Sequence, residues 1–263
     1  MAVIDWRIFL LPYEQAVDEI KVKFKSIRTE LRTKNEYSPI EFITGRVKQI
    51  SSIIEKANKF DIPISRIDEE IEDIAGLRIM CQFVGDIHKV VDIIRNRKDM
   101  QIMYEKNYIK DRKASGYRSY HMIVKYGVET AYGHKEILSE FQIRTLAMNF
   151  WATVEHSLNY KYKHQIPSEI KTQLVNAADA AFRLDELMME IRDEIVDSQK
   201  FFETKSSAVT DITEDINFLN NDNNVKEANR LNLKLNKALE DGSIDELLDL
   251  RSISKKLVTK RFK

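Results

Sequence analysis

The chain has 263 residues, enough to bury one sizeable core and to carry an appendage. Its 42 Lys and Arg residues balance 42 Asp and Glu residues, so the net charge identifies no class of partner. The single cysteine, Cys81, excludes an intrachain disulfide and suits a reducing compartment. The amino terminus lacks the features of a signal peptide, and no stretch approaches the roughly 20 apolar residues of a membrane span. We therefore expect a cytoplasmic protein that binds no membrane.

The first predicted element is a helix over about 7–33, where apolar residues recur every three or four positions and Pro12 suits the first turn. A separate stripe on this helix carries only cations: Lys21, Lys25, Arg28 and Arg32. Acidic residues lie on the same helix, so composition alone favours a solvated face. A second helix is predicted to begin at Gly45, with a buried stripe of Val47, Ile50, Ile54 and Ala57.

Strands dominate the middle of the chain. The alternation of apolar and polar residues predicts four of them, at residues 75–84, 101–110, 117–126 and 136–145. A helix follows the first strand, and a hairpin-like connection joins the last two. The predicted fold class is α+β, a mixed sheet with helices on its faces.

The carboxyl-terminal part is predicted to be helical, beginning with residues 146–162. Beyond Pro167, apolar residues keep an alternating four-and-three spacing: Ile170, Leu174, Ala177, Ala181, Leu184, Met188, Ile191 and Ile195. This heptad seam predicts packing against another helix, in the same chain or in a partner. From about residue 205 the composition becomes polar, which predicts a loosely attached and partly disordered extension with short helices at 225–239 and 243–258.

These elements define the predicted domain organisation. One domain covers residues 1–204, with a core at about 40–163 and helical flanks at 7–33 and 168–204, and an extension covers 205–263.

Candidate phosphate and metal ligands lie around the first strand. Four polar residues share one face of the second predicted helix and could follow a polyphosphate: Arg46, Lys48, Ser52 and Lys56. A solvated helix face explains the same spacing, and helix statistics alone favour it. Asp73 directly precedes the strand and could hold Mg²⁺, although Asp is also common in turns. Arg78 must leave the core-facing side of the strand, so it needs solvent or an anion.

A second group surrounds the stretch KASGYRSYHMIVKY, residues 113–126. Lys113 and His121 could contact phosphates and Tyr117 could stack on a nucleobase, although a lone histidine is more often structural. On the last strand Glu140 and Gln142 share a face with Arg144. That face is either exposed to solvent or the floor of a site. Two carboxylates, an aromatic platform and several cations together fit Mg²⁺-dependent phosphoryl transfer between nucleotides.

Four segments, in this order, resemble consecutive motifs of the RelA/SpoT-type alarmone synthetases: GRVKQISSIIEK, EDIAGLRIMCQF, KASGYRSYHMIV and EFQIRTLAMNFWATVEHSLNYKY. The resemblance covers about residues 5–202. Within the family, the sequence is most similar to the single-domain small alarmone synthetases of the RelQ type. It implies a nucleotidyltransferase-like fold and GTP diphosphokinase activity in stringent-response signalling. In that reaction ATP and GDP or GTP give AMP and ppGpp or pppGpp, with Mg²⁺ as cofactor.

The resemblance also implies a role for individual residues. Asp73 matches the magnesium-binding aspartate, and Glu140 matches the catalytic glutamate close to the metal. The positions that match ATP contacts are Arg46, Lys48, Ser52, Lys56 and Arg78. The positions that match or resemble GDP and GTP contacts are Lys113, Tyr117, His121, Gln142 and Asn149.

Assembly and regulation follow from the same resemblance. It implies a homotetramer with a cleft between subunits that binds pppGpp as an allosteric activator. The residues that resemble this cleft are Lys21, Lys25, Arg28, Glu41, Phe42 and Thr44. None of the five histidines is followed by Asp, so the metal motif of the hydrolase domain is absent and no alarmone hydrolysis is expected.

Two other classes of function stay open. One is a catalytically weak regulatory protein that binds guanine nucleotides and single-stranded RNA through its basic faces. The intact Asp73 and Glu140 weigh against it. The other is a structural module organised around the heptad helix, which predicts that nucleotides leave the melting temperature unchanged.

Overall fold

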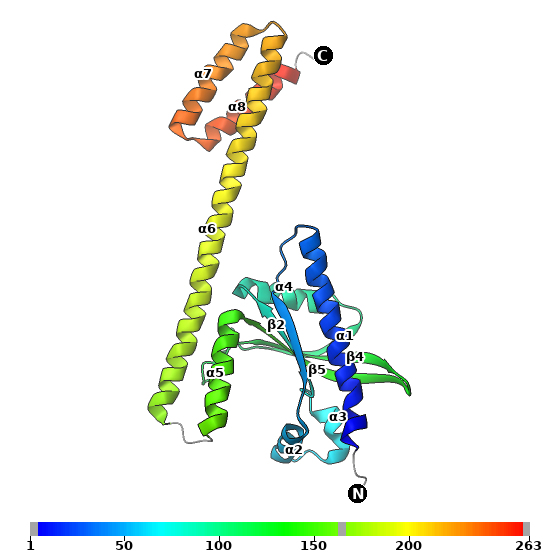
Figure 1. Ribbon diagram of the computed structural model, residues 1–263. Helices are drawn as coiled ribbons and strands as arrows, with labels where there is room; N and C mark the ends of the chain where they lie inside the picture. The colour runs from blue at the N-terminus through cyan, green and yellow to red at the C-terminus, as the bar shows by residue number, and fades with distance from the viewer. Residues whose placement is uncertain (1–4, 163–166, 260–263) are drawn as a thin grey trace. The chain divides into compact units, whose positions relative to one another are not determined.

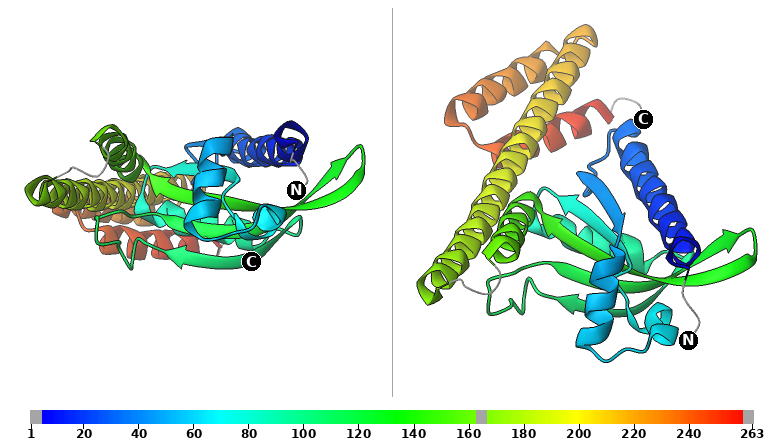
Figure 2. Two further views of the ribbon diagram at one scale, coloured as in Figure 1. Left: turned by 90° about the horizontal axis from the view of Figure 1, so that it is seen from below. Right: turned by 60° about the horizontal axis from the view of Figure 1, so that its bottom comes forward.

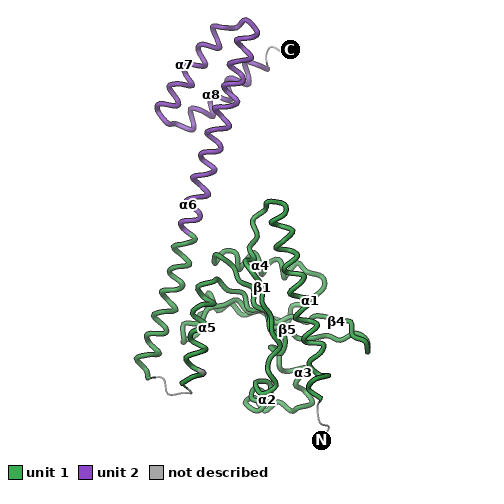
Figure 3. The backbone as a smooth tube through the Cα atoms, viewed as in Figure 1, with its two compact units in different colours: residues 1–189 green, residues 190–263 purple. Residues whose placement is uncertain are grey.

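The computed structural model describes residues 5–162 and 167–259. It divides into two compact units, residues 1–189 and residues 190–263 (Figure 3). Unit 1 contains a five-stranded sheet with strand order β1-β2-β5-β4-β3 (Figure 1). The strands are β1 (Phe42–Val47), β2 (Ala75–Cys81), β3 (Met100–Asn107), β4 (Tyr120–Thr130) and β5 (Gly133–Thr145). Because β2 and β5 are parallel and the other pairs are antiparallel, the sheet is mixed and the α+β class is confirmed.

One face of this sheet carries the main core of unit 1. Leu77 and Phe141 point into it, together with Phe24 of helix α1 and Val90 of helix α4. The rings of Phe24 and Phe141 lie 5.5 Å apart. The helices of this unit are α1 (Trp6–Thr33), α2 (Ile50–Lys59), a 3₁₀ turn (Ile64–Arg66), α3 (Ile67–Glu70), α4 (Val84–Arg95), α5 (Leu146–Tyr162) and the first part of α6 (Ser168–Asn221). Since α1 and α4 belong to the core, polar side chains gather on the opposite face.

Helix α1 spans Trp6–Thr33, which agrees with the predicted range of about 7–33 to within one residue. The Asp5 side chain accepts hydrogen bonds from the backbone N–H groups of Arg7 (3.1 Å) and Ile8 (3.4 Å), which caps the helix before Trp6. Trp6 also packs against the core, so burial favours a helical turn before Pro12. The prediction that Pro12 lies in the first turn is therefore wrong, because Pro12 lies inside the helix.

The helix predicted from Gly45 is wrong in its first residues. Gly45 lies in β1 opposite Leu77 of β2, and α2 begins only at Ile50. A Cβ on Gly45 would lie 2.7 Å from Cγ1 of Val17, so glycine is needed for α1 to approach the strand closely. The buried residues of α2 are Ile53 and Ala57, whereas Ile50 and Ile54 are exposed. Pairing with β2 has overridden the local helical pattern.

Strand β4 begins later and ends later than predicted, at Tyr120 and Thr130. The N–H of Gly116 donates to the carbonyl of Lys113, and the N–H of Lys113 donates to the carbonyl of Tyr117. These bonds close a turn before the strand, so Tyr117 belongs to a loop. The hairpin between β4 and β5 turns between Thr130 and Gly133 and reaches beyond the other strands (Figure 2).

Unit 2 contains the later part of α6 together with α7 (Val225–Asp241) and α8 (Ile244–Thr259). The two short helices predicted in the extension are confirmed. Apolar residues of all three helices form a separate core: Ala208, Ile212, Ile216, Leu219, Ala228, Leu231, Leu235, Ala238, Leu247 and Leu250. The polar composition of the extension predicts partial disorder, whereas its described residues are almost entirely helical. In residues 5–162 and 167–259, no helix has the length and apolar character that a bilayer crossing requires.

Candidate active site

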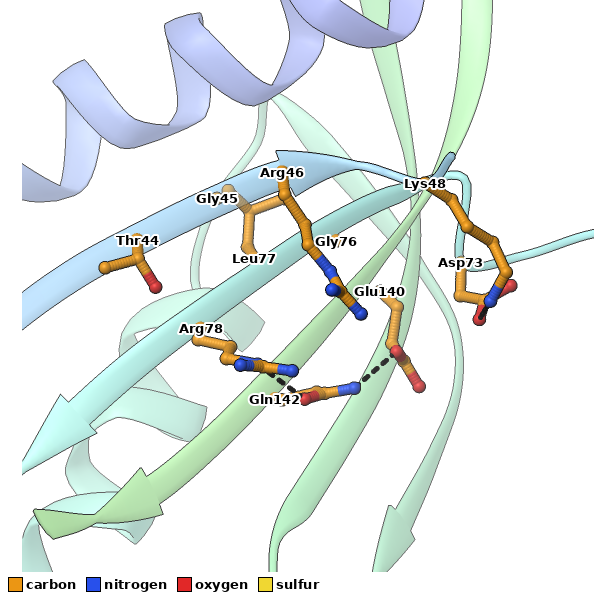
Figure 4. Close-up of a pocket in the computed structure, with 10 residues that line it drawn as sticks. All are labelled: Thr44, Gly45, Arg46, Lys48, Asp73, Gly76, Leu77, Arg78, Glu140 and Gln142. Atoms are coloured by element: carbon orange, nitrogen blue, oxygen red, sulfur yellow. Dashed lines mark hydrogen bonds and ion pairs between the residues drawn. The ribbon is translucent and has the colours of Figure 1, made fainter. Parts of the chain in front are cut away.

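A pocket of about 250 Å³ opens on the polar face of the sheet (Figure 4). Its walls come from β1, β2, β5 and the segments that flank them. The lining residues are Thr44, Gly45, Arg46, Lys48, Asp73, Gly76, Leu77, Arg78, Glu140 and Gln142. Six of the residues predicted for nucleotide or metal binding therefore meet in one pocket: Arg46, Lys48, Asp73, Arg78, Glu140 and Gln142.

Strand register explains why these residues meet. Arg78 of β2 lies opposite Gln142 of β5, which lies opposite His121 of β4. Residues directly opposite each other in a sheet share a face, so the three side chains form one row across the polar face. Glu140 lies in the next row, opposite Gly76, and Gly76 lies opposite Arg46 of β1. Gly76 has no side chain, which leaves room between Arg46 and Glu140.

Asp73 lies between two lysines at one end of the pocket. Its carboxylate accepts hydrogen bonds from Nζ of Lys48 (2.7 Å) and Nζ of Lys56 (2.8 Å). Burial raises the pKa of the Asp73 carboxyl, but the hydrogen bonds and charges of the lysines outweigh it, so the pKa lies below its usual value. Lys48 follows β1 and Lys56 lies on α2, so two elements hold this carboxylate ionised.

Glu140 is the second carboxylate of the pocket. It accepts hydrogen bonds from Nδ1 of His121 (2.9 Å) and Nε2 of Gln142 (2.7 Å). Burial and the charge of Asp73 raise the pKa of Glu140. The contacts with His121 and Gln142 lower it by more, so the pKa lies below its usual value. Asp73 and Glu140 line the same pocket, so both carboxylates are available to one ligand.

The hydrogen-bonded chain continues from His121 to a tyrosine. Nε2 of His121 lies 2.7 Å from the hydroxyl of Tyr117. With the imidazole proton on Nδ1, which faces Glu140, Nε2 accepts from that hydroxyl. Arg144 donates to the Tyr117 hydroxyl (2.5 Å) and to Oε1 of Gln142 (2.7 Å). This series of hydrogen bonds therefore links the Glu140 carboxylate to the loop before β4.

Three arginines surround the polar row. Arg78 donates from Nε to Oε1 of Gln142 (3.1 Å), the same oxygen that Arg144 contacts. Burial lowers the pKa of Arg78, and the charges of Arg144 and Arg46 lower it further. The cluster therefore has a positive potential that favours an anion. Arg144 is not among the predicted site residues, although its alternation with Gln142 in the sequence places it on this strand face.

The loop 108–119 places aromatic rings and a cation beside this chain. Nζ of Lys113 lies 4.6 Å from the ring centre of Tyr108 and 5.1 Å from that of Tyr117. The ring of Tyr108 stands edge-on to His121, with centroids 5.1 Å apart. Tyr108 is not among the predicted site residues; it lies just after β3 and before the cation-rich stretch. The loop thus presents the platform that the sequence predicts, with a second tyrosine beside it.

Two predicted site residues lie apart from these contacts. Ser52 is half-buried on α2 and does not line the pocket. Asn149 lies on α5, and its buried Oδ1 has no hydrogen-bond partner among the described residues. A buried acceptor without a partner is costly, so an external donor at this position would be stabilising.

The residues predicted for an allosteric cleft divide into two groups. Arg28 of α1 lies 3.7 Å from the carboxylate of Glu41, which also pairs with Arg32 at 3.3 Å. Lys25 is exposed on the same helix. Thr44 instead lines the pocket, although its neighbour Phe42 lies outside it.

The pocket fits a magnesium ion that arrives with a nucleotide. No group of three His, Cys, Asp or Glu side chains in residues 5–162 and 167–259 is arranged to hold a metal. Asp73 and Glu140 nevertheless supply two ionised carboxylates beside several cations. Mg²⁺ is commonly held by one or two carboxylates together with substrate phosphates and waters. The donor set is therefore suited to a metal shared with the substrate.

Paired carboxylates, lysines, arginines and an aromatic loop on one sheet face are the components of a nucleotide-dependent phosphoryl-transfer enzyme. Comparison with known proteins agrees. The family model described as "Region found in RelA / SpoT proteins" matches residues 45–165. The GTP pyrophosphokinase YjbM of Bacillus subtilis (strain 168) is 54% identical over 200 residues, which cover 76% of this chain and 94% of the relative.

Solved structures give the same result. The small alarmone synthetase 1 of Bacillus subtilis bound to its product pppGpp is 55% identical, with a TM-score of 0.70 over 72% of this chain and 97% of that chain. The same synthetase bound to AMPCPP is 52% identical, with a TM-score of 0.65 over 73% and 98%. The chain belongs to the RelA/SpoT family and, within it, to the small alarmone synthetases. It is a GTP pyrophosphokinase that produces (p)ppGpp.

Proposed function

We propose that this enzyme transfers the β,γ-pyrophosphoryl group of ATP to the 3′-hydroxyl of GDP or GTP and releases AMP. The observation that carries this proposal is the arrangement of polar groups on one sheet face. Lys56 binds Asp73, Asp73 and Glu140 line one pocket, and Glu140 is linked through His121 to Tyr117. This arrangement joins a polyphosphate-binding end to an aromatic end across one sheet face. Relatives bound to the ATP analogue AMPCPP and to pppGpp support both nucleotide assignments.

ATP is proposed to occupy the β1–β2 end of the pocket. Lys48 and Lys56 neutralise its phosphates, because both ammonium groups already lie within 2.8 Å of one anion, the Asp73 carboxylate. The arginines Arg46 and Arg78 line the same pocket and could hold the adenine between two planar guanidinium groups. Ser52 follows on α2, beyond the lining residues.

GDP or GTP is proposed to bind at the β4 end. Tyr117 offers its ring to guanine, and Lys113 and His121 lie beside it for the acceptor's phosphates. Gln142 connects this end to Glu140. Asn149 carries a buried carbonyl oxygen that has no partner in the part of the chain that the structure describes, which supports a role in accepting a hydrogen bond from the guanine base.

The proposed reaction breaks one bond and forms one bond at the β-phosphorus of ATP. The 3′-oxygen of the acceptor attacks this phosphorus, and the bond to the α,β-bridging oxygen breaks, so AMP leaves with that oxygen. Glu140 accepts the hydroxyl proton, since its lowered pKa keeps it ionised before the reaction. Lys48 and Lys56 stabilise the charge on the transferred group. Mg²⁺, held by Asp73 and Glu140 with the phosphates, would shield the charge of the polyphosphate.

Product analysis tests this reaction directly. The protein is incubated with Mg²⁺, ATP and either GDP or GTP, and the nucleotides are separated by anion-exchange chromatography. We expect equal amounts of AMP and of a guanosine nucleotide phosphorylated at both 5′ and 3′ positions. Formation of ADP in place of AMP would show transfer of a single phosphoryl group and contradict the proposal. The Glu140→Gln variant serves as the inactive control.

We also propose a homotetramer, with a groove between α5 and α6 as part of the subunit contact. The groove has a volume of about 750 Å³ and is mainly apolar. Phe150 (71% exposed), Leu184 (53%) and Met188 (46%) line it and are more exposed than large apolar side chains usually are. A second copy of the seam would cover them. Light scattering at micromolar concentration that gives a monomer of 30.9 kDa would contradict this assembly.

Regulation by pppGpp is the remaining part of the proposal. Lys21, Lys25 and Arg28 form a cationic stripe on α1, and Arg28 lies 3.7 Å from the carboxylate of Glu41. Phe42 and Thr44 follow Glu41 in the sequence, in β1. Two copies of such a stripe facing each other would repel, and a polyanion would relieve that repulsion and favour the assembled state. We expect pppGpp to stimulate the wild type, and a Lys25→Ala, Arg28→Ala double variant to keep its basal activity without stimulation. An unchanged response in that variant would leave the stripe as a solvated face.

A further inference from the structure

The loop 108–119 is fixed to α6 by one carboxylate and two arginines. Asp179 of α6 pairs with Nη1 of Arg112 (2.5 Å) and with Nη2 of Arg118 (3.0 Å). Arg118 also donates to the backbone carbonyl of Ala178 at 3.4 Å. Its guanidinium lies 4.4 Å from the ring centre of Phe182. Asp179 is therefore the common partner of both arginines of the loop.

The backbone of the loop touches the same part of α6. Gly116 has a φ of +89°, and a Cβ at this position would lie 2.6 Å from Cβ of Ala178. Glycine is thus required both by the backbone conformation and by the close approach to the helix. Tyr117, the next residue, packs against a small cluster formed by Trp151, Ala152 and Ala178. The position of the Tyr117 ring consequently depends on how the loop lies on α6.

The two arginines serve the loop itself and are not free for a substrate. The Arg118 side chain is only 11% exposed, and its guanidinium is occupied by a carboxylate, a carbonyl and an aromatic face. Arg112 is 48% exposed and forms the outer ion pair. Neither residue lines the pocket over the sheet. Their charges are therefore directed to Asp179, away from the phosphates.

We propose that Asp179 is a positioning residue for the acceptor nucleotide, acting by holding the 108–119 loop, and with it Tyr117 and Lys113, against α6. This inference rests on the proposed function, which places GDP or GTP on that loop. The ATP end of the pocket is built from β1, β2 and α2, which Asp179 does not contact. Loss of the carboxylate should therefore weaken acceptor binding and leave the binding of ATP unchanged.

Steady-state kinetics with each substrate varied in turn test this separation. For Asp179→Asn we expect the KM for GDP to rise about fivefold to tenfold and the KM for ATP to stay within twofold, as the loss of two ion pairs of this exposure predicts. Asp179→Glu should restore most of the GDP affinity because it keeps the charge. Arg112→Gln, at an exposed position with little effect on folding, should raise the KM for GDP by about twofold to threefold.

Limited digestion with trypsin gives a readout that does not depend on activity. The loop contains four sites for the protease: Lys110, Arg112, Lys113 and Arg118. Release of the loop from α6 should speed cleavage at these sites severalfold in Asp179→Asn, as followed by mass spectrometry. Asp193→Asn is the matched control, because this α6 carboxylate belongs to unit 2 and pairs with the neighbouring Arg192 at 2.6 Å. Its cleavage pattern and both KM values should equal those of the wild type.

The Tyr117→Ala variant separates failure of this inference from failure of the proposed function. If Tyr117→Ala raises the KM for ATP and not for GDP, the acceptor assignment itself is wrong. If Tyr117→Ala weakens GDP while Asp179→Asn changes neither the KM for GDP nor the cleavage rate, the acceptor site stands and the positioning role is overturned. A fall in melting temperature and kcat with an unchanged KM for GDP would likewise assign Asp179 a purely structural role.

Discussion

Residues 1–189 and residues 190–263 are each built around an apolar core, yet they differ in which polar side chains they bury. Among the described residues, Ser254 is the buried polar side chain of unit 2. Unit 1 buries Asp86, Ser119, Ser139, Arg144, Thr145 and Asp185. Buried polar groups cost free energy unless they are paired, so their concentration in unit 1 requires a reason.

Part of that reason is the site. Arg144 and Ser119 lie behind the polar row, where Nε of Arg144 donates to the Ser119 hydroxyl at 3.3 Å. In unit 2 the ion pair between Arg251 and Asp211 and the bond from Ser254 to Asp215 join α8 to α6 at the edge of an apolar core. The polar side chains of the pocket thus lie in unit 1, whereas these polar contacts of unit 2 join its helices.

The largest expected effect is the loss of either pocket carboxylate. Asp73→Asn and Glu140→Gln should each reduce the rate of pyrophosphoryl transfer on the order of a hundredfold or more, because each removes a proposed metal ligand or the proton acceptor. Nucleotide chromatography measures the rate, and circular dichroism should show an unchanged fold. Turnover close to that of the wild type in either variant would refute the assignment of chemistry to this pocket.

A smaller effect is expected at the aromatic end. Tyr117→Ala should weaken GDP binding by about 1–3 kcal/mol, the usual contribution of a base–aromatic stack, with little change in the KM for ATP. Tyr117→Phe is the matched control, since it keeps the ring and removes only the hydroxyl that contacts His121 and Arg144. Equal losses of GDP affinity in both variants would assign the effect to the hydroxyl and not to the ring.

Asp185 is a buried carboxyl group of unit 1 that lies outside the pocket, so we expect it to affect stability and not the reaction. Asp185 accepts a hydrogen bond from the Thr145 hydroxyl (2.5 Å), and burial, only partly offset by that bond, raises its pKa to about 6. The folded protein thus binds this proton more tightly than the unfolded chain, whose carboxyl has a pKa near 3.8. This group makes the free energy of unfolding fall as the pH rises from about 4 to about 6, with no further loss above that range.

We therefore expect Asp185→Asn to raise the free energy of unfolding at pH 7 by about 1–2 kcal/mol. The gain should disappear near pH 4, where the carboxyl of the folded wild type is protonated. Urea unfolding at both pH values measures the difference. An equal gain at pH 4 and pH 7 would show that the charge of Asp185 is not its cause.

The smallest effect on activity is expected from removing residues 205–263, which make up most of unit 2. A chain that ends at residue 204 should keep kcat and both KM values within about twofold, because the site lies wholly in unit 1 and the family match covers residues 45–165. The same assay with purified protein checks this. A loss of tenfold or more would show that the extension contributes to the reaction and would remove the contrast between the units.

The sequence pattern predicted those elements of the fold that depend on residues close together in the sequence. The core face of β2, with Leu77 and Ile79, follows from alternation, and the helices of the extension follow from periodicity. The start of α2 could not be predicted, because Gly45 is fixed by its contact with Val17 and by pairing with β2. Such long-range contacts leave no local signal.

The site shows the same division. The residue types around Asp73 and Glu140 indicated phosphoryl transfer, and the structure places both in one pocket. Tyr108 and Asp179 could not be identified from the sequence, since each acts through a partner distant in the chain. Ser52 shares a helix face with Lys56, yet only the lysine reaches Asp73. Spacing along a helix predicts which face a side chain lies on, but not which groups it contacts.

The Lys48–Asp73–Lys56 contact has a thermodynamic consequence. In the resting protein the two ammonium groups and the carboxylate act as internal counterions for each other. A nucleotide that arrives without a divalent cation can take the lysines only by leaving the carboxylate unpaired, and a cation that arrives alone leaves the lysines unpaired. We therefore expect the binding of the two ligands to be coupled, so that each tightens the other by the same factor. On this expectation the metal–nucleotide complex binds as a single ligand, because the lysines and the carboxylate exchange partners together.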